Sequence, residues 1–246
     1  MRSHRRHLTR LLLALLTLQA ASCAAAWEKT ETEHLVLHYK PNSYAARNLS
    51  RACREYESVY ESMFGYVPEE HIENKYRVFL HENTRRMGWV NHFTDSVHYR
   101  YDAAVRLVSS HEFMHLVLED ANPNAPGRFQ EGICRMREYR WRSIGKERYE
   151  AELYRLGLWE PLNAWNLDYQ FERGYDTDGQ GNVAAACAKW LEDRLGPEEF
   201  WRLYVELSPS NYRELLKQRF SASWEALQAD FLAFREALEP PPDRLR

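Results

Sequence analysis

Strand-like alternation of apolar side chains is confined to the first hundred residues of this 246-residue chain. Apolar or aromatic residues occupy every second position in His34–Tyr39, Tyr76–His81 and Ser96–Tyr101, which is typical of strands with one buried face. Further along the chain, the apolar residues instead recur at steps of three and four, the period of a helix. This order predicts an α+β protein, in which a small N-terminal mixed sheet is followed by a mainly helical C-terminal part.

Capping and breaking residues predict where the helices begin and end. A helix should begin after Ser43 and end near Gly65, and another should run from about Ala103 to Leu118, before Asn122-Pro123. Asn182 should cap a helix that Gly196-Pro197 closes, and Asn211 with Glu214 should form a capping box. The helix capped by Asn182 should span Val183–Leu195, and the remaining helices are expected at Gly127–Arg142, Phe200–Leu207 and Trp224–Leu238.

Residues 1–22 differ in composition from the rest of the chain. Four arginines are followed by the apolar run Leu11–Leu18 and then by small residues, which is the pattern of a signal peptide. The apolar run is shorter than the roughly 20 residues that span a bilayer. The alternative is a buried N-terminal helix or a membrane anchor. We therefore expect an exported protein, located in the periplasm or outside the cell.

Two processing patterns compete directly after this segment. Ala24 and Ala26 before Trp27 suit an ordinary signal peptidase, whereas Ala20-Ala21-Ser22-Cys23 resembles a bacterial lipobox with Cys23 as the lipidated residue. The second pattern predicts attachment to a membrane through Cys23. Of the other cysteines, at least one of Cys53, Cys134 and Cys187 is expected to be a buried apolar residue.

The charge balance excludes nucleic acid as the expected partner. Residues 1–22 hold four of the 33 basic residues and none of the 36 acidic ones, so the remainder has 29 basic and 36 acidic residues, a formal charge of −7. Proteins that bind nucleic acid need a basic surface to contact phosphates.

The pentapeptide His111-Glu112-Phe113-Met114-His115 has the pattern His-Glu-x-x-His. On a helix, residues four apart lie on one face, one turn from each other. Two imidazoles placed in this way can bind one Zn²⁺, and the carboxylate of Glu112 can then reach a water molecule on that ion. The sequence therefore predicts one zinc ion with Glu112 as a general base.

Glu131 is the predicted third ligand. Fifteen residues separate His115 from Glu131, which is enough for a loop and the start of a second helix. Three protein ligands would leave the fourth zinc position open, as catalytic sites require. The alternative is an exposed carboxylate near a helix start. Glu119 would need a strained approach from the same helix, and Glu138 is expected in solvent.

Other histidines are not expected to bind this ion. His34 and His38 lie on one face of a strand, roughly 13 Å apart, too far for a shared metal. His92 and His98 flank an expected turn and should lie at the surface.

Together, the pentapeptide and the element Phe129-Gln130-Glu131-Gly132 resemble the gluzincin zinc peptidases, above all the bacterial peptidase MA-like domains. The resemblance runs from about Glu33 to Leu238 and includes two weaker helical patterns, at Lys189–Gly196 and Phe220–Leu227. It implies a zincin-like catalytic domain over residues 27–240, with the sheet and active-site helix in 27–120 and the helical part in 121–240.

The resemblance also implies a function and further site residues. The expected activity is zinc-dependent hydrolysis of a peptide or protein substrate, and the expected oxyanion donor is Tyr175, with Tyr139 and Tyr169 as rivals. An edge strand before the active-site helix should pair with extended substrate, and Ser96–Tyr101 is the candidate. Some gluzincins place an acid four residues after the glutamate ligand, where this chain has Arg135.

Two alternatives to an active peptidase remain at this point. The chain could keep the fold without turnover and serve as a peptidase-like binding module in the envelope. It could also be a structural helical lipoprotein in which His111 and His115 are coincidental.

Overall fold

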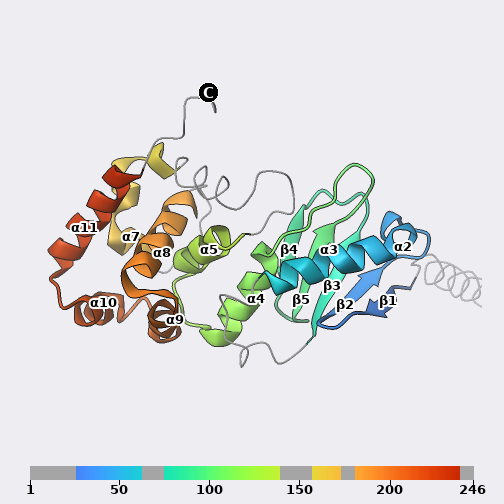
Figure 1. Ribbon diagram of the computed structural model, residues 1–246, viewed down its shortest axis with the longest axis horizontal. Coiled ribbons are helices and arrows are strands. Elements are labelled where there is room, and N and C mark those ends of the chain that lie inside the picture. Colours follow the sequence, from blue (N-terminus) through green and yellow to red (C-terminus); the bar gives the residue numbers. More distant parts are fainter. Residues whose placement is uncertain (1–25, 63–74, 139–156, 173–180, 239–246) are drawn as a thin grey trace, which may run out of the picture.

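The computed structural model describes residues 26–62, 75–138, 157–172 and 181–238. The molecule is elongated, with the sheet at one end and the late helices at the other (Figure 1). Between them lie α4 (His111–Ala121) and α5 (Gly127–Met136). The predicted α+β class is confirmed. The predicted leader, residues 1–22, and Cys23 lie outside the described residues.

Five strands of the described chain form one mixed sheet, in the order β1-β2-β3-β5-β4. The three central strands run parallel to one another, and each outer strand is antiparallel to its neighbour. The predicted strands are confirmed as β2, β3 and β5, whereas the two outer strands were not predicted. The strands are β1 (Glu28–Glu31), β2 (Leu35–Tyr39), β3 (Tyr76–His81), β4 (Gly88–Asn91) and β5 (Ser96–Arg100).

The prediction that Ser96–Tyr101 forms an edge strand is wrong. β5, the strand predicted over Ser96–Tyr101, pairs with β3 on one side and β4 on the other, so it lies inside the sheet. The edge is β4, which precedes β5 in the chain and turns back to pair with it. β4 has four residues and includes Gly88, so it is too short to show a clear alternation.

One face of the sheet forms the N-terminal core. Its buried residues, among them Leu37, Val78 and Tyr99, point toward α3 (Leu49–Glu61) and α4. Tyr56 of α3 stacks on Tyr99 with ring centroids 5.4 Å apart, and Phe113 of α4 lies 5.9 Å from the same ring. α3 and α4 therefore cover the same face, and the pentapeptide helix is anchored to the sheet by its apolar side.

The opposite face of the sheet carries a row of stacked rings. His38, Phe79, His98 and Trp89 come from four neighbouring strands, and successive ring centroids lie 4.3, 4.7 and 4.7 Å apart. His98 is inside β5 and half-buried, so the prediction that it lies at the surface is wrong, whereas His92 is exposed as expected. Burial, with the nearby His81 and His38, lowers the pKa of His98 to about 4.

α4 begins eight residues later than predicted, at His111 rather than about Ala103. The intervening segment is held in a turn, because Asp102 Oδ1 accepts hydrogen bonds from the backbone N–H groups of Ala104 and Val105, each at 2.8 Å. A short aspartate side chain that binds nearby backbone in this way competes with helix formation. The motif therefore stands at the very start of its helix.

The helix predicted between Ser43 and Gly65 is confirmed in part. Ser43 Oγ accepts a hydrogen bond from Ala46 N at 3.1 Å and caps α2 (Tyr44–Arg47), as expected. The helix is interrupted at Asn48, after which α3 runs to Glu61. The predicted end near Gly65 lies outside the described residues.

The C-terminal helices pack around α8 (Gly181–Leu195), which lies along α5. A Cβ atom on Gly132 of α5 would stand 2.4 Å from the carbonyl oxygen of Ala184, so the two helices meet without room for a side chain. On the far side of α8, Trp190 packs on Phe220 and donates to Asp230 at 2.8 Å. The other elements are η2 (Leu162–Trp165), α7 (Leu167–Phe171), α9 (Pro197–Glu206), α10 (Tyr212–Phe220) and α11 (Trp224–Ala237).

Two cap predictions have different outcomes. α8 ends at Leu195, Gly196 follows it with a φ of 80°, and Pro197 begins α9, as expected. The capping box at Asn211 is wrong, because the Asn211 side chain makes no cap hydrogen bond. Asn211 Oδ1 instead accepts a hydrogen bond from Ser208 N, and its Nδ2 donates to Glu206 O, each at 2.8 Å.

A buried polar cluster joins α4, α5 and α9. Asn122, the residue that ends α4, donates from Nδ2 to the carbonyl oxygens of Tyr204 and Leu207, each at 2.7 Å. The Tyr204 hydroxyl donates to Leu118 O at 2.7 Å and accepts from Gln130 Nε2 at 3.0 Å. These bonds fix the two central helices against the C-terminal part.

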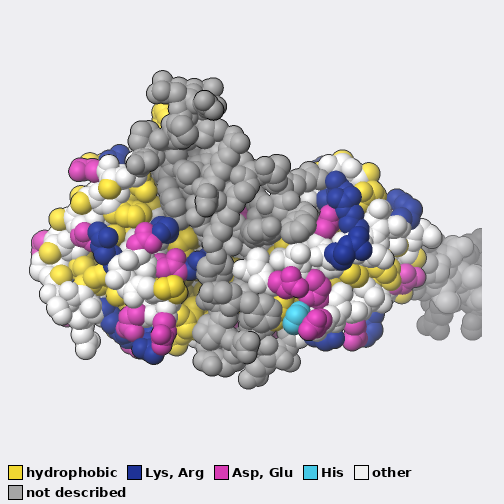
Figure 2. All heavy atoms as spheres, in the orientation of Figure 1, with side chains coloured by type: hydrophobic (Ala, Val, Ile, Leu, Met, Phe, Trp, Pro, Cys, Tyr) yellow, Lys and Arg dark blue, Asp and Glu magenta, His cyan; other side chains and the backbone are white. Residues whose placement is uncertain are grey.

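Cys134 and Cys187 are buried free thiols, which confirms the interpretation of a buried apolar residue, and Cys53 is free and partly exposed. No helix within the described residues has both the length and the apolar character that crossing a bilayer requires. Charges of both signs lie on the face drawn in Figure 2, with a group of Lys and Arg over α2 and α3.

Candidate metal centre

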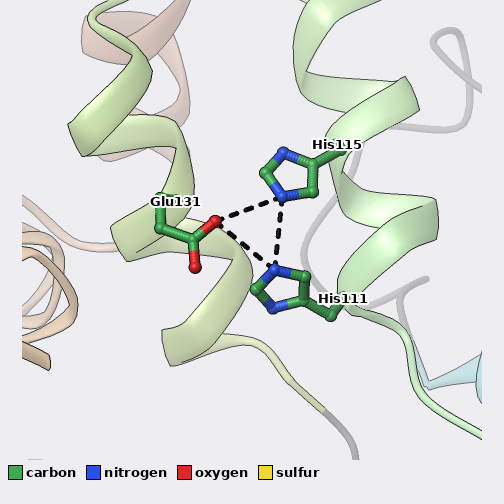
Figure 3. Close-up of side chains that lie close together, drawn as sticks. All are labelled: His111, His115 and Glu131. Atoms are coloured by element: carbon green, nitrogen blue, oxygen red, sulfur yellow. Dashed lines mark hydrogen bonds and ion pairs between the residues drawn. The ribbon is translucent and has the colours of Figure 1, made fainter. Parts of the chain in front are cut away.

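The three predicted ligands come together between the two central helices. His111 and His115 project from the same side of α4, one turn apart, and Figure 3 shows both rings pointing toward α5. Glu131, near the middle of α5, points back at them. The turn after Asn122 reverses the chain, so two segments separated in sequence face each other as the spacing predicted.

The ligating atoms form a nearly equilateral triangle. Nε2 of His111 lies 3.2 Å from Nε2 of His115, and Glu131 Oε2 lies 3.4 and 3.3 Å from these two nitrogens. A tetrahedral zinc ion with bonds of about 2.0–2.1 Å would hold its ligand atoms about 3.3–3.4 Å apart. The spacing of the three atoms therefore fits zinc, and among the described residues this is the group of His, Cys, Asp and Glu side chains with a metal-binding arrangement.

Hydrogen bonds alone do not explain this triangle. A neutral imidazole has one N–H, so each Nε2 atom is either a donor or an acceptor. If both nitrogens donate to Glu131, two donors face each other at 3.2 Å; if one donates to the other, the second ring has no proton for the carboxylate. One side of the triangle is always unfavourable without a cation.

Burial and charge act in opposite directions on these side chains, which are only 14–18% exposed. Burial lowers the pKa of His111, but its hydrogen bond to Glu131 and the charge of that carboxylate raise it above the ordinary value. Burial raises the pKa of Glu131, yet hydrogen bonds with His111, His115 and Arg135 bring it far below the usual range. Glu131 is thus an anion, as a zinc ligand must be.

Glu112 lies beside the triangle and next to the edge strand. A Cβ atom on Gly88 of β4 would stand 2.9 Å from Glu112 Oε1, so the carboxylate is in close contact with the strand backbone. Burial raises the pKa of Glu112, although the charges of His111 and His115 oppose this shift. A carboxylate with a raised pKa accepts a proton more readily than an exposed glutamate does.

Glu138 is wrongly predicted to be in solvent. Its side chain is 7% exposed, and its Oε2 lies 3.8 Å from His111 Nδ1, the ring nitrogen that faces away from the triangle. Ser109 Oγ donates to Glu138 Oε1 at 3.3 Å. At 3.8 Å the Glu138 carboxylate is within ion-pair range of His111 but too far for a hydrogen bond, and His111 Nδ1 has no hydrogen-bond partner among the described residues.

The alternative metal ligand Glu119 and the candidate oxyanion donors either contact other groups or lie outside the described residues. Glu119 Oε2 pairs with His92 Nδ1 at 2.6 Å. Of the candidate oxyanion donors, Tyr175 and Tyr139 lie outside the described residues, and the ring of Tyr169 stacks under the Arg128 guanidinium at 3.7 Å. The role predicted for Tyr175 stays a prediction.

His34 and His38 each contact other side chains. His34 Nδ1 lies 2.9 Å from Glu57 Oε2, and His38 belongs to the row of stacked rings.

Comparisons of the chain with protein-family models, with curated proteins and with solved structures found no match. The resemblance to gluzincins therefore rests on the motif residues alone and stays a hypothesis.

Proposed function

We propose that this chain is a zinc-dependent peptidase in which His111, His115 and Glu131 hold one Zn²⁺ and Glu112 is the general base. The observation that carries the proposal is the triangle of ligating atoms, with sides of 3.2, 3.3 and 3.4 Å. Two imidazole nitrogens and one carboxylate oxygen are also the donor types that catalytic zinc sites use.

Zinc bound by three protein ligands and one open position supplies Lewis acidity and a water nucleophile close to neutral pH. In this proposal Glu112 would take the proton of the attacking water and pass it to the amine that leaves. Its contact with β4 fixes the carboxylate, and its raised pKa suits it to both steps.

β4 is the strand proposed to bind the substrate. Within the described residues it pairs with β5 alone, so its other edge has backbone groups that an extended peptide can bind. The same strand contacts Glu112 through Gly88, which would bring a bound peptide bond next to the base. This arrangement supports a peptide or protein as the substrate.

Several further predictions belong to this proposal. A gluzincin-type domain over residues 27–240, export directed by residues 1–22, and a lipid anchor at Cys23 all follow from the sequence patterns and stay predictions. The acidic balance of the chain is consistent with a substrate other than nucleic acid.

Zinc stoichiometry tests the metal site. We expect about one tightly bound ion in the wild-type protein and a large loss of affinity in Glu131→Ala. Glu119→Ala is the matched control, because Glu119 is a partly buried glutamate that pairs with His92 instead of the triangle. Wild-type protein that binds no zinc after purification in its presence would end the proposal.

A second variant tests the activity. Glu112→Gln should keep the zinc ion and lose cleavage of a mixed peptide library by a factor of about 10²–10⁴. A wild-type protein that binds zinc but cleaves nothing in the library would favour the alternative of a peptidase-like binding module.

A further inference from the structure

The two oxygens of the Glu131 carboxylate have different partners. Oε2 faces both imidazoles, and Figure 3 shows the other oxygen directed away from them. That oxygen, Oε1, accepts a hydrogen bond from Arg135 Nε at 2.7 Å. Arg135 lies one turn after Glu131 on α5, so both members of the pair are on the same helix.

The fold makes room for this arginine. A Cβ atom on Gly181, the first residue of α8, would stand 2.3 Å from Arg135 Nε and 2.6 Å from its Cζ. The guanidinium therefore lies against bare backbone at a helix start, and its Nη1 lies 3.5 Å from Asn182 Oδ1. Most surface pairs of residues four apart on a helix have no such cradle and contribute little. Here a second helix fixes the side chain that binds the Glu131 carboxylate.

We propose that Arg135 is a positioning residue that holds Glu131 as a one-oxygen zinc ligand, an inference that rests on the metal site proposed above. Carboxylates can bind a cation through one or both oxygens. The hydrogen bond to Arg135 holds Oε1 away from both imidazoles, so Oε2 is the oxygen directed at the ion. This keeps the fourth position of the zinc open, as the catalytic cycle requires.

The guanidinium group of Arg135 is also unable to bind the ion itself. Glu112, Glu131 and Glu138 place three carboxylates near the two histidines, and Arg135 donates a hydrogen bond to Glu131. The arginine fixes Glu131 without competing for the ion, because a guanidinium has donors but no acceptor.

The test uses two variants of the same size. In Arg135→Gln, the amide nitrogen stands the same number of bonds from Cα as Arg135 Nε, so the donor to Glu131 is kept and the charge is removed. In Arg135→Met, the side chain has a similar length and no donor. Full-length wild-type protein and both variants are titrated with Zn²⁺, and the visible spectrum is recorded after loading with Co²⁺, whose bands weaken when coordination rises from four to five.

We expect Arg135→Gln to bind zinc as the wild type does and to keep its four-coordinate Co²⁺ spectrum. Arg135→Met should bind zinc about 10–100-fold more weakly, and its Co²⁺ bands should lose intensity as Glu131 becomes bidentate. Gly181→Ala, which displaces Arg135, should weaken zinc binding in the wild-type background but not in Arg135→Met.

Equal zinc affinity and equal spectra for Arg135→Gln and Arg135→Met would overturn the inference while leaving the metal site intact. A wild-type protein that binds neither Zn²⁺ nor Co²⁺ would instead overturn the proposed function, and the inference with it. Thermal unfolding of each variant shows whether a weak binder is folded.

Discussion

The polar cluster at the end of α4 gives a prediction that needs no substrate. Asn122 is 5% exposed and donates to two backbone carbonyls, those of Tyr204 and Leu207. Asn122→Ala removes both donors and leaves the two acceptors facing a cavity that the smaller side chain cannot fill. Water has little access to this position, so the lost bonds are not replaced.

The expected cost follows from the hydrogen bonds. Leaving one buried polar group without its partner costs about 1–3 kcal/mol, so two such groups cost about 2–6 kcal/mol. The lower half of this range is the better guide, because Tyr204 O also accepts from Leu207 N at 3.2 Å and keeps one bond. Such a loss is a large part of the 5–15 kcal/mol by which domains are stable.

Denaturant unfolding at neutral pH measures this loss. Asn124→Ala is the matched control, because Asn124 is exposed, lies two residues away and uses only its backbone N–H in this turn. We expect the control to lie within about 0.5 kcal/mol of the wild type. If Asn122→Ala were as stable as Asn124→Ala, the cluster would not join the central helices to the C-terminal part.

Two further predictions concern the sheet. Gly88→Ala should push the Glu112 carboxylate away from β4 and lower the rate of peptide cleavage by about tenfold to hundredfold with zinc content unchanged; an unaltered rate would show that β4 does not fix the base. His98 has a pKa of about 4 when folded and 6.5 as its ordinary value, so the unfolded chain binds a proton more readily between these pH values. The stability that neutral His98 provides should therefore be complete above pH 6.5 and be lost as pH falls toward 4, by about 1–2 kcal/mol after solvent screening. Unfolding measured across this range should show a smaller pH dependence for His98→Gln than for the wild type.

Much of the fold could be predicted from sequence because its strongest elements have clear periodicity. The alternation in Leu35–Tyr39 and Tyr76–His81 reflects a sheet with one buried face, and Gly196-Pro197 marks a helix boundary through backbone conformation alone. β1 and β4 lack this signal, since Glu28–Glu31 is polar and Gly88–Asn91 is short. Missing β4 led directly to the wrong choice of edge strand.

The candidate site shows the same division. His111, His115 and Glu131 could be predicted because their convergence depends on helix geometry and one short turn. Glu138 and Gly88 could not, since their roles depend on how α5 and β4 pack against α4. Glu138 lies two residues beyond the last residue of α5, so helix periodicity gives no signal for its position.

The three proposed ligands all belong to a stretch of 21 residues, His111–Glu131, whereas the contact that fixes Glu112 comes from Gly88 on the sheet. The chain between His115 and Glu131 is short, so bringing the three ligands together costs little loop-closure entropy. We therefore expect an ion to be captured early in folding, by two helices alone. Catalytic activity would appear later, when the strands have assembled and β4 contacts Glu112. Zinc binding and activity would thus be acquired in separate steps of folding.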